Sequence, residues 1–152
     1  GNASGAAGND TLSNIEDIAG SDYNDTLIGD DGRNVISGGA GDDSIDGGAG
    51  DDTLLGGAGN DIIEGGDGTD TVDYSASEPV TINLAEGTAT SESGTDTLSG
   101  VENVIGSAGA DDITGDDGVN VINAGSGSDT IRGGAGDDTL SGGSGADVYK
   151  IA

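Results

Sequence analysis

The sequence predicts an all-β fold of stacked coils, and three observations support this prediction. Units of nine residues recur along most of the chain, glycine supplies 33 of the 152 residues, and Phe, Trp and Met are absent. A short fixed period is typical of a solenoid, in which each unit packs mainly on its neighbours. Without large aromatic side chains, any core must be thin and consist of Ile, Val and Leu.

The nine-residue units form two dense blocks. The first opens with a looser unit at Gly20, GSDYNDTLI, and continues as GDDGRNVIS, GGAGDDSID, GGAGDDTLL, GGAGNDIIE and GGDGTDTVD. The second opens at Gly106 and reads GSAGADDIT, GDDGVNVIN, AGSGSDTIR, GGAGDDTLS and GGSGADVYK. Six residues of each unit are expected to form a turn and three to form a strand. This constant phase argues against a flexible Gly-rich linker.

Position eight of each unit is apolar or aromatic. Side chains alternate across a strand, so position eight is expected to point inward and positions seven and nine outward. The predicted core is a ladder of Leu27, Ile36, Ile45, Leu54, Ile63, Val72, Ile113, Ile122, Ile131, Leu140 and Tyr149. We expect Tyr149 and Ile151 to cap the end of this ladder.

Composition limits the partners of the chain. The formal net charge is −27, from 30 acidic and 3 basic residues. Nucleic acid is excluded because no basic patch could contact phosphates, and membrane insertion because no apolar run could span a bilayer. Arg33 and Arg132 are expected to neutralise neighbouring carboxylates. The natural partner of such an acidic chain is a cation.

The residue types select calcium and exclude catalysis. Cysteine and histidine are absent, which removes the usual ligands of zinc and copper and the usual general base. Oxygen ligands remain, and these suit Ca²⁺. The glutamates could only serve glycoside chemistry as pairs facing a cleft, and nothing in the pattern predicts one; they are Glu78, Glu86, Glu92 and Glu102. We therefore expect no enzyme. Position three is mostly Ala and position nine is varied, so neither provides the flat row of one residue type, often Thr, that ice binding needs.

Position six supplies the candidate carboxylate ligands. It is always Asp or Asn, and a degenerate unit, SESGTDTLS, adds one more. The candidates are Asp25, Asn34, Asp43, Asp52, Asp61, Asp70, Asp96, Asp111, Asn120, Asp129, Asp138 and Asp147. Asn34 and Asn120 are either weaker ligands or the ends of a row of sites.

Glycine lets the turn aim backbone carbonyls into one small space, because it adopts backbone angles closed to residues with a Cβ. We expect the carbonyls of positions two and four to face one ion together with the position-six carboxylate. These glycines are Gly39, Gly41, Gly48, Gly50, Gly57, Gly59, Gly66, Gly68, Gly125, Gly127, Gly134, Gly136, Gly143 and Gly145. Position five adds Asp42, Asp51, Asn60 and Asp137.

Two nonapeptides are expected to make one coil, so that turns two units apart stack about 4.8 Å from each other. Asp43 then shares a site with the turn that holds Asp61, and Asp52 with the turn that holds Asp70. Each stacked pair can hold one ion, which gives roughly 7–10 Ca²⁺ per chain. One apolar residue in nine cannot offset the chain entropy lost on ordering, so we expect calcium to fold a disordered apo chain.

A longer period encloses the nonapeptides. TLSNIEDIAGSDYNDTLIGDDGRNVI from Thr11 aligns with TLSGVENVIGSAGADDITGDDGVNVI from Thr97, an offset of 86 residues. We expect one continuous roll, 1–152, with a first unit 1–86 and a second, truncated unit 87–152. Dense nonapeptides fill 20–73 and 106–150, and wider rungs fill 74–105, including a strand in VTINL (80–84). The chain is expected to be a segment of a tandem array.

The nonapeptides resemble the haemolysin-type calcium-binding repeats (repeats in toxin, RTX) of bacterial secreted proteins, with signature G-G-x-G-x-D-x-U-x. TVDYS, VTINLAEGTAT and DTLSGVENVIGS between the blocks carry the same resemblance. It implies a right-handed parallel β-roll with Ca²⁺ stacked between Gly/Asp-rich turns, and type I secretion to the extracellular space or the bacterial cell surface. The sequence departs from the signature at Ala124, Tyr23, Asn34 and Asn120, which alters the ligands expected there.

Three roles compete within this resemblance. The 86-residue unit favours a structural module of an extracellular adhesin, filament or surface-layer protein. The alternative is the C-terminal calcium-binding and secretion module of a type I-secreted enzyme or toxin, such as a protease, lipase or epimerase. A carbohydrate-binding module would need an aromatic platform or cleft that the sequence does not predict. Further 86-residue units in the flanking sequence would favour the first role.

Overall fold

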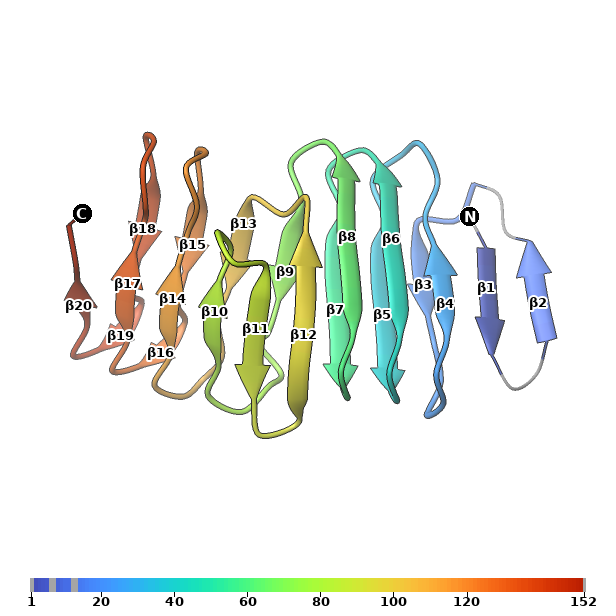
Figure 1. Ribbon diagram of the computed structural model, residues 1–152, viewed down its shortest axis with the longest axis horizontal. Coiled ribbons are helices and arrows are strands. Elements are labelled where there is room, and N and C mark those ends of the chain that lie inside the picture. Colours follow the sequence, from blue (N-terminus) through green and yellow to red (C-terminus); the bar gives the residue numbers. More distant parts are fainter. Residues whose placement is uncertain (1, 6–7, 12–13, 152) are drawn as a thin grey trace.

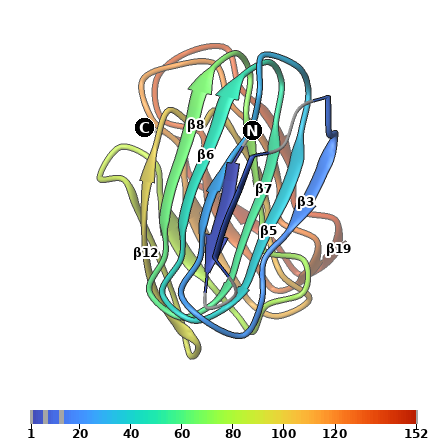
Figure 2. The ribbon, with the colours of Figure 1, turned by 90° about the vertical axis from the view of Figure 1, so that its right-hand side faces the viewer.

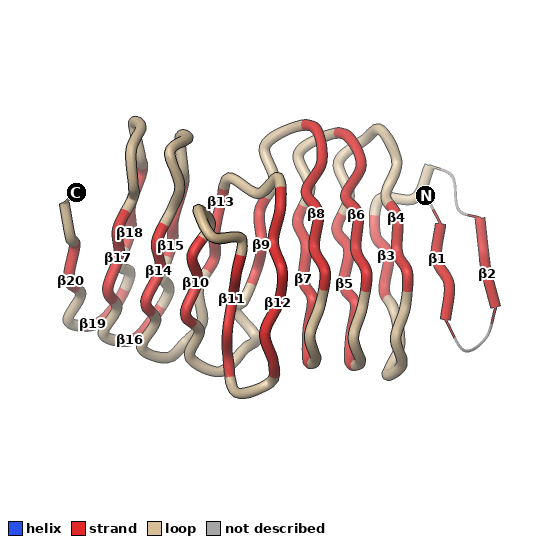
Figure 3. The backbone as a smooth tube through the Cα atoms, viewed as in Figure 1, coloured by secondary structure: helices blue, strands red, loops and turns tan. Residues whose placement is uncertain are grey.

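The computed structural model describes residues 2–5, 8–11 and 14–151, and in these residues all regular structure is β (Figures 1 and 3). Eleven strands form the larger sheet, in the order β2-β1-β4-β6-β8-β12-β11-β10-β14-β17-β20. Seven strands form the second sheet, in the order β18-β15-β13-β9-β7-β5-β3. Seen along the long axis, the two sheets face each other and turns join them at both edges (Figure 2). No helix in the described residues is long and apolar enough to cross a membrane.

The strands of the larger sheet are β1 (Asn2–Gly5), β2 (Gly8–Thr11), β4 (Thr26–Ile28), β6 (Ser44–Ala49), β8 (Ile62–Asp67), β10 (Thr81–Asn83), β11 (Thr88–Ser91), β12 (Gly94–Ser99), β14 (Asp112–Thr114), β17 (Thr130–Arg132) and β20 (Val148–Tyr149). Those of the second sheet are β3 (Asp17–Ala19), β5 (Val35–Ala40), β7 (Thr53–Ala58), β9 (Thr71–Asp73), β13 (Asn103–Ile105), β15 (Val121–Asn123) and β18 (Thr139–Ser141). Two short strands in the turns, β16 (Ser126–Gly127) and β19 (Ser144–Gly145), pair with each other.

Two nonapeptides make one coil, as predicted. Successive strands alternate between the sheets, and each pairs in parallel with the strand two units later. Leu27 is opposite Ile45, which is opposite Ile63. In the other sheet Ile36 is opposite Leu54. The fold is therefore the predicted all-β parallel roll.

The apolar ladder forms the core. The position-eight side chains from Leu27 to Val72 and from Ile113 to Ile131 are almost completely buried, and their neighbours at positions seven and nine are more exposed. The ladder weakens at its C-terminal end, where Leu140 is partly buried and Tyr149 is 50% exposed. The predicted cap by Ile151 is wrong, because this side chain is 98% exposed.

The strands of the first block are longer than predicted. Strands β5 to β8 have six residues each, because the ladder continues through the first three positions of the next unit. Gly39, for example, is opposite Gly57, and Ala40 is opposite Ala58. In the second block β14, β15, β17 and β18 have the predicted three residues.

The wide rungs expected between the blocks are an antiparallel meander in the larger sheet (Figure 1). Strand β12 pairs in parallel with β8, β11 lies antiparallel between β12 and β10, and β10 pairs in parallel with β14. The second sheet passes directly from β9 to β13. The apolar residues of this region are buried, namely Leu98, Val101 and Val104.

Candidate metal sites

The position-six side chains line the turns in two rows, one at each edge of the roll. Most are buried: Asp25, Asn34, Asp43, Asp52, Asp61, Asp70, Asp96, Asp111, Asn120 and Asp129. Asp138 and Asp147, near the C-terminal end, are half-buried. Residues 18 apart in sequence are neighbours in a row, because two nonapeptides make one coil.

In most of these acids one carboxylate oxygen accepts a hydrogen bond from the backbone of the preceding coil. The N–H of Asp25 donates to Oδ1 of Asp43 over 2.8 Å, and the N–H of Asp43 donates to Oδ1 of Asp61 over 2.9 Å. At the other edge the N–H of Asp52 donates to Oδ1 of Asp70 over 2.8 Å. The pairs predicted to share sites are therefore neighbours in the structure. The same contact links Asp111 to Asp129 and Asp129 to Asp147.

The other oxygen has no partner in five of these carboxylates. Among the described residues, Oδ2 is buried and accepts no hydrogen bond in Asp43, Asp52, Asp61, Asp70 and Asp129. A buried anionic oxygen without a donor is strongly unfavourable, because it loses its hydrogen bonds to water and gains none from the protein. A cation beside these atoms would compensate their charge, and carboxylate oxygens are ligands that Ca²⁺ prefers.

Burial also raises the pKa of the same acids. Desolvation is the main cause for Asp43, Asp52, Asp70, Asp96 and Asp129, and a backbone N–H bond to each one opposes it. Burial raises the pKa of Asp61 to about 6, with a further rise from the negative charges of Asp96 and Asp43. In both rows, therefore, burial disfavours the charged form of these acids more than the hydrogen bonds to them favour it.

Position one of the turn differs from positions two and four in its backbone angles. The glycines at positions two and four have positive φ, for example 109° at Gly39 and 108° at Gly41, as expected of residues that bend the turn. Position one does not. Instead, a Cβ added to Gly106 would lie 2.7 Å from Oδ2 of Asp111 and 2.6 Å from the carbonyl oxygen of Ala124. Glycine at position one thus leaves room beside the carboxylate.

The turn carbonyls point in alternate directions along the axis. A Cβ on Gly57 would meet the carbonyl oxygen of Gly39, and one on Gly59 would meet that of Gly41, so the carbonyls of positions two and four face the following coil. The position-one carbonyl of Gly56 faces back toward Gly38. Some position-two carbonyls also accept a hydrogen bond from that coil, as Asp30 does from the Ala49 N–H over 3.2 Å. A carbonyl oxygen has a second lone pair for a metal.

The position-five residues form an outer, exposed row. The N–H of Asn60 donates to Oδ1 of Asp42 over 2.9 Å, and the N–H of Thr69 donates to Oδ1 of Asp51 over 3.0 Å. Asp137 is exposed as well. The structure does not bring these side chains to the buried oxygens of position six, and their predicted role as ligands gains no support from it.

The amide groups of the two asparagines at position six are hydrogen-bonded to backbone groups of the protein. The Oδ1 of Asn34 accepts the N–H of Asp30, and its Nδ2 donates to the carbonyl of Ile15 over 3.0 Å. Asn120 repeats both bonds, to Asp116 and to the Glu102 carbonyl over 2.9 Å. An amide N–H₂ thus takes the place where a metal would link two coils, which favours Asn as the end of a row over Asn as a weaker ligand.

Asp96 differs from the five acids that have an unpartnered Oδ2. The hydroxyl of Tyr74 donates to its Oδ2 over 2.7 Å, and the N–H of Asp61 donates to its Oδ1 over 3.0 Å. Both oxygens therefore have partners, as they do in Asp111, whose Oδ1 accepts the N–H of Val80 and whose Oδ2 accepts the N–H of Ser107. Asp96 and Asp111 are thus less suited to bind a metal than the acids with an unpartnered Oδ2. At the other edge Oε2 of Glu102 accepts the N–H of Asp70 over 2.8 Å. Sequence reasoning missed both Tyr74 and Glu102, because neither occupies a nonapeptide position six.

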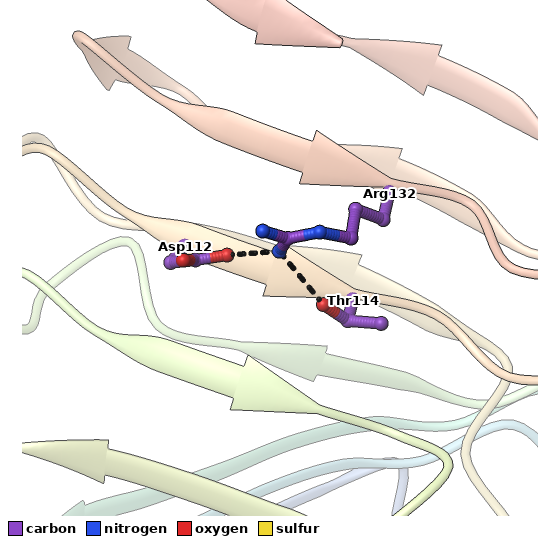
Figure 4. A network of polar contacts seen from close by, with 3 residues as sticks. All are labelled: Asp112, Thr114 and Arg132. Carbon is purple, nitrogen blue, oxygen red and sulfur yellow. Dashed lines mark hydrogen bonds and ion pairs between the residues drawn. The ribbon is translucent and has the colours of Figure 1, made fainter. Parts of the chain in front are cut away.

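The acids of one site come from different turns. In the described residues no three acidic side chains converge on a common point, so each candidate site would combine carboxylates of stacked turns with backbone carbonyls. Arg132 contributes charge neutralisation instead: its guanidinium lies 2.6 Å from Oδ1 of Asp112 and donates to the Thr114 hydroxyl (Figure 4). This confirms the role predicted for Arg132, and the one for Arg33 stays a prediction.

One family of sequences matches the chain. Its description is "RTX calcium-binding nonapeptide repeat", and four copies match residues 19–54, 46–76, 96–131 and 114–149. The matched segments contain both rows of position-six acids, and the gap between them falls on the meander. No curated protein matches the chain.

Proposed function

The chain belongs to the family of RTX calcium-binding nonapeptide repeats, and we propose that it is a structural module that folds on Ca²⁺ outside the cell, as a segment of a repetitive adhesin, filament or surface-layer protein. Its repeats bind several calcium ions. The described residues are built almost entirely from such coils, which suits a structural element better than a catalytic one.

The observation that carries the proposal is the row of unpartnered oxygens. Oδ2 of Asp43 and Oδ2 of Asp61 lie on one edge, those of Asp52 and Asp70 lie on the other, and Asp129 repeats the arrangement in the second block. We propose that Ca²⁺ bridges stacked turns at these oxygens, with carbonyls of the Gly-rich turn completing the six to eight ligands that calcium prefers. When bound, the ion would compensate the buried charge and link one coil to the next.

The extracellular setting follows from the same chemistry. A chain whose folding requires calcium stays unfolded where calcium is scarce and folds where calcium is abundant. The acids outnumber the three bases tenfold, so the calcium-loaded roll would remain acidic and soluble. The internal offset of 86 residues supports the tandem array, since an array requires only repetition of one unit.

Native mass spectrometry at rising calcium concentration tests the proposed function. We expect several ions to bind per chain, with the ion number rising together with the loss of the extended charge-state distribution of an unfolded chain. Magnesium at the same concentration serves as control, because it keeps its own waters and suits all-protein cages poorly. A chain that binds no calcium, or whose charge states do not respond to bound calcium, would refute the proposal.

A further inference from the structure

The N-terminal hairpin repeats a hairpin of the meander. In β1 and β2, Asn2 is opposite Thr11 and Gly5 is opposite Gly8. In β11 and β12, Thr88 is opposite Thr97 and Ser91 is opposite Gly94. Each of these residues lies 86 positions from its counterpart, so the two hairpins are the same element in two copies of the unit.

The two copies have different neighbours in the sheet. Strand β14 is the counterpart of β4, 86 residues later. Strand β14 pairs in parallel with β10, and β11 lies beyond β10. Strand β4 pairs directly with β1, in antiparallel orientation (Figure 1). The position that β10 occupies beside β14 is therefore occupied beside β4 by the hairpin itself.

Strand β10 fits its position closely. Ile82 is opposite Ile113, and both are almost completely buried. The Val80 N–H donates to Oδ1 of Asp111 over 2.8 Å, and the Leu84 N–H donates to the carbonyl of Thr114 over 2.9 Å. Backbone and side-chain contacts thus act together to hold this strand in register.

The β4 edge carries the counterparts of the β14 acceptors, but β1 lies beside it where a strand like β10 lies beside β14. Asp25 is the counterpart of Asp111, and within residues 14–151 its carboxylate accepts hydrogen bonds only from Ser21, both on Oδ2. Leu27, the counterpart of Ile113, is opposite an alanine, Ala3, where Ile113 is opposite an isoleucine. The residue that β1 places opposite Leu27 is thus smaller than the isoleucine that β10 places opposite Ile113.

We propose that the β4 edge, Thr26–Ile28, is an acceptor for a strand with the chemistry of Thr81–Asn83, supplied by another 86-residue unit. The incoming strand pairs in parallel with β4, donates to Asp25 as Val80 does to Asp111, and moves the β1–β2 hairpin one place outward. Residues 67–86 then act as the segment that joins successive units, with β9 in one sheet and β10 in the other. This inference rests on the proposed tandem array.

Cysteine pairs report the pairing directly, because the chain contains no cysteine of its own and neighbouring strands lie within disulfide distance. The test protein is the full chain preceded by an added copy of residues 67–86, folded in calcium. We expect Thr26→Cys to form a disulfide with Thr81→Cys in the added copy, and Ile28→Cys with Asn83→Cys in the added copy. Pairing Ile28→Cys with Thr81→Cys is the out-of-register control and should form much less.

The same protein with Thr26→Cys and Ser4→Cys reports the antiparallel pairing of the unextended chain. We expect this disulfide to form readily without the added segment and to be largely lost with it. An added segment carrying Ile82→Asp is the matched control, and it should restore the Ser4 disulfide.

Continued cross-linking of Ser4 in the extended chain, or equal yields from the in-register and out-of-register pairs, would overturn the inference. Circular dichroism of the same samples distinguishes failure of the strand acceptor from failure of the proposed calcium-dependent folding. A chain that folds in calcium but keeps the Ser4 disulfide refutes only the strand acceptor, whereas a chain that does not fold in calcium refutes the proposed function and the acceptor with it.

Discussion

The Tyr74 hydroxyl donates a 2.7 Å hydrogen bond to Oδ2 of Asp96, the oxygen that has no partner in Asp43, Asp52, Asp61, Asp70 and Asp129. Tyr74 is buried under the meander, and burial raises its pKa, as does the Asp96 charge, so the phenol stays protonated and remains a donor. At this turn a side chain supplies the hydrogen bond that those five carboxylates lack.

Replacing Tyr74 with Phe leaves Asp96 with a buried, unpartnered oxygen. We expect Tyr74→Phe to lower the free energy of unfolding of the calcium-loaded protein by about 1–3 kcal/mol, the usual cost of an unsatisfied buried acceptor. Urea denaturation in saturating calcium measures it. Tyr23→Phe is the matched control, since that ring is 64% exposed. Equal stability of the two variants would show that the Tyr74 bond does not stabilise the roll.

Removing the charge of one position-six carboxylate should reduce the number of calcium ions that the chain binds. We expect Asp52→Asn to lower the number of bound ions by about one or two, because each carboxylate lies between stacked turns, and to raise the calcium concentration needed for folding. Its neighbour provides the control, since Asp51 lies in the exposed outer row. Calcium titration calorimetry compares Asp52→Asn with Asp51→Asn. Identical ion numbers in both variants would contradict the assignment of the buried row.

The absence of a Cβ at position one should also be necessary for calcium-induced folding at low calcium concentration. A Cβ on Gly47 would lie 2.5 Å from Oδ2 of Asp52, at a place where we expect an ion. Gly47→Ala should therefore shift calcium-induced folding to higher calcium, with a loss of about 1–3 kcal/mol typical of overpacking. Gly32→Ala is the control, because the nearest atom to its Cβ lies at 3.3 Å and its φ is not positive. A similar calcium midpoint for both variants would exclude the steric role.

Mild acid should favour the calcium-free fold. The pKa of Asp61 is raised from 3.8 to about 6 in the calcium-free fold, so between these values the folded apo chain holds a proton that the unfolded chain has lost. The apo fold therefore gains stability as pH falls through about 6. Circular dichroism of the chain in chelator at pH 7 and at pH 5 measures the effect. We expect more β-structure at pH 5 than at pH 7, and less β-structure at pH 5 would contradict the shift.

The sequence predicted the coil because each nonapeptide position has one chemical task. Ile45 is buried because it occupies position eight, and Asp43 lies in a turn because it occupies position six. The same holds for the equivalent residues of the other units, so the phase of the repeat was sufficient to predict the coil. The pairing of β11 between β12 and β10 could not be predicted in this way. It depends on contacts between segments with no shared period, and alternation in Val80–Leu84 indicates a strand without indicating its partner.

The candidate sites were predictable only in part. The repeat places Asp43 beside the turn of Asp61, and the structure brings the two together. The repeat pattern could not reveal that the Tyr74 hydroxyl bonds to Asp96, 22 residues later, or that Asn34 donates to the carbonyl of Ile15. Both contacts depend on which side chain faces a turn in three dimensions, and a nine-residue pattern does not contain that information.

Far-ultraviolet circular dichroism of the chain in excess chelator and in millimolar calcium tests the central claim most directly. Without calcium, the buried carboxylates at Asp43, Asp52, Asp61 and Asp70 oppose folding, and the thin apolar ladder does not offset the entropy of ordering the chain. We predict a disordered spectrum in chelator that converts cooperatively to a β-rich spectrum on addition of calcium, and returns when chelator is added again. A β-rich spectrum in chelator that calcium leaves unchanged would contradict the account.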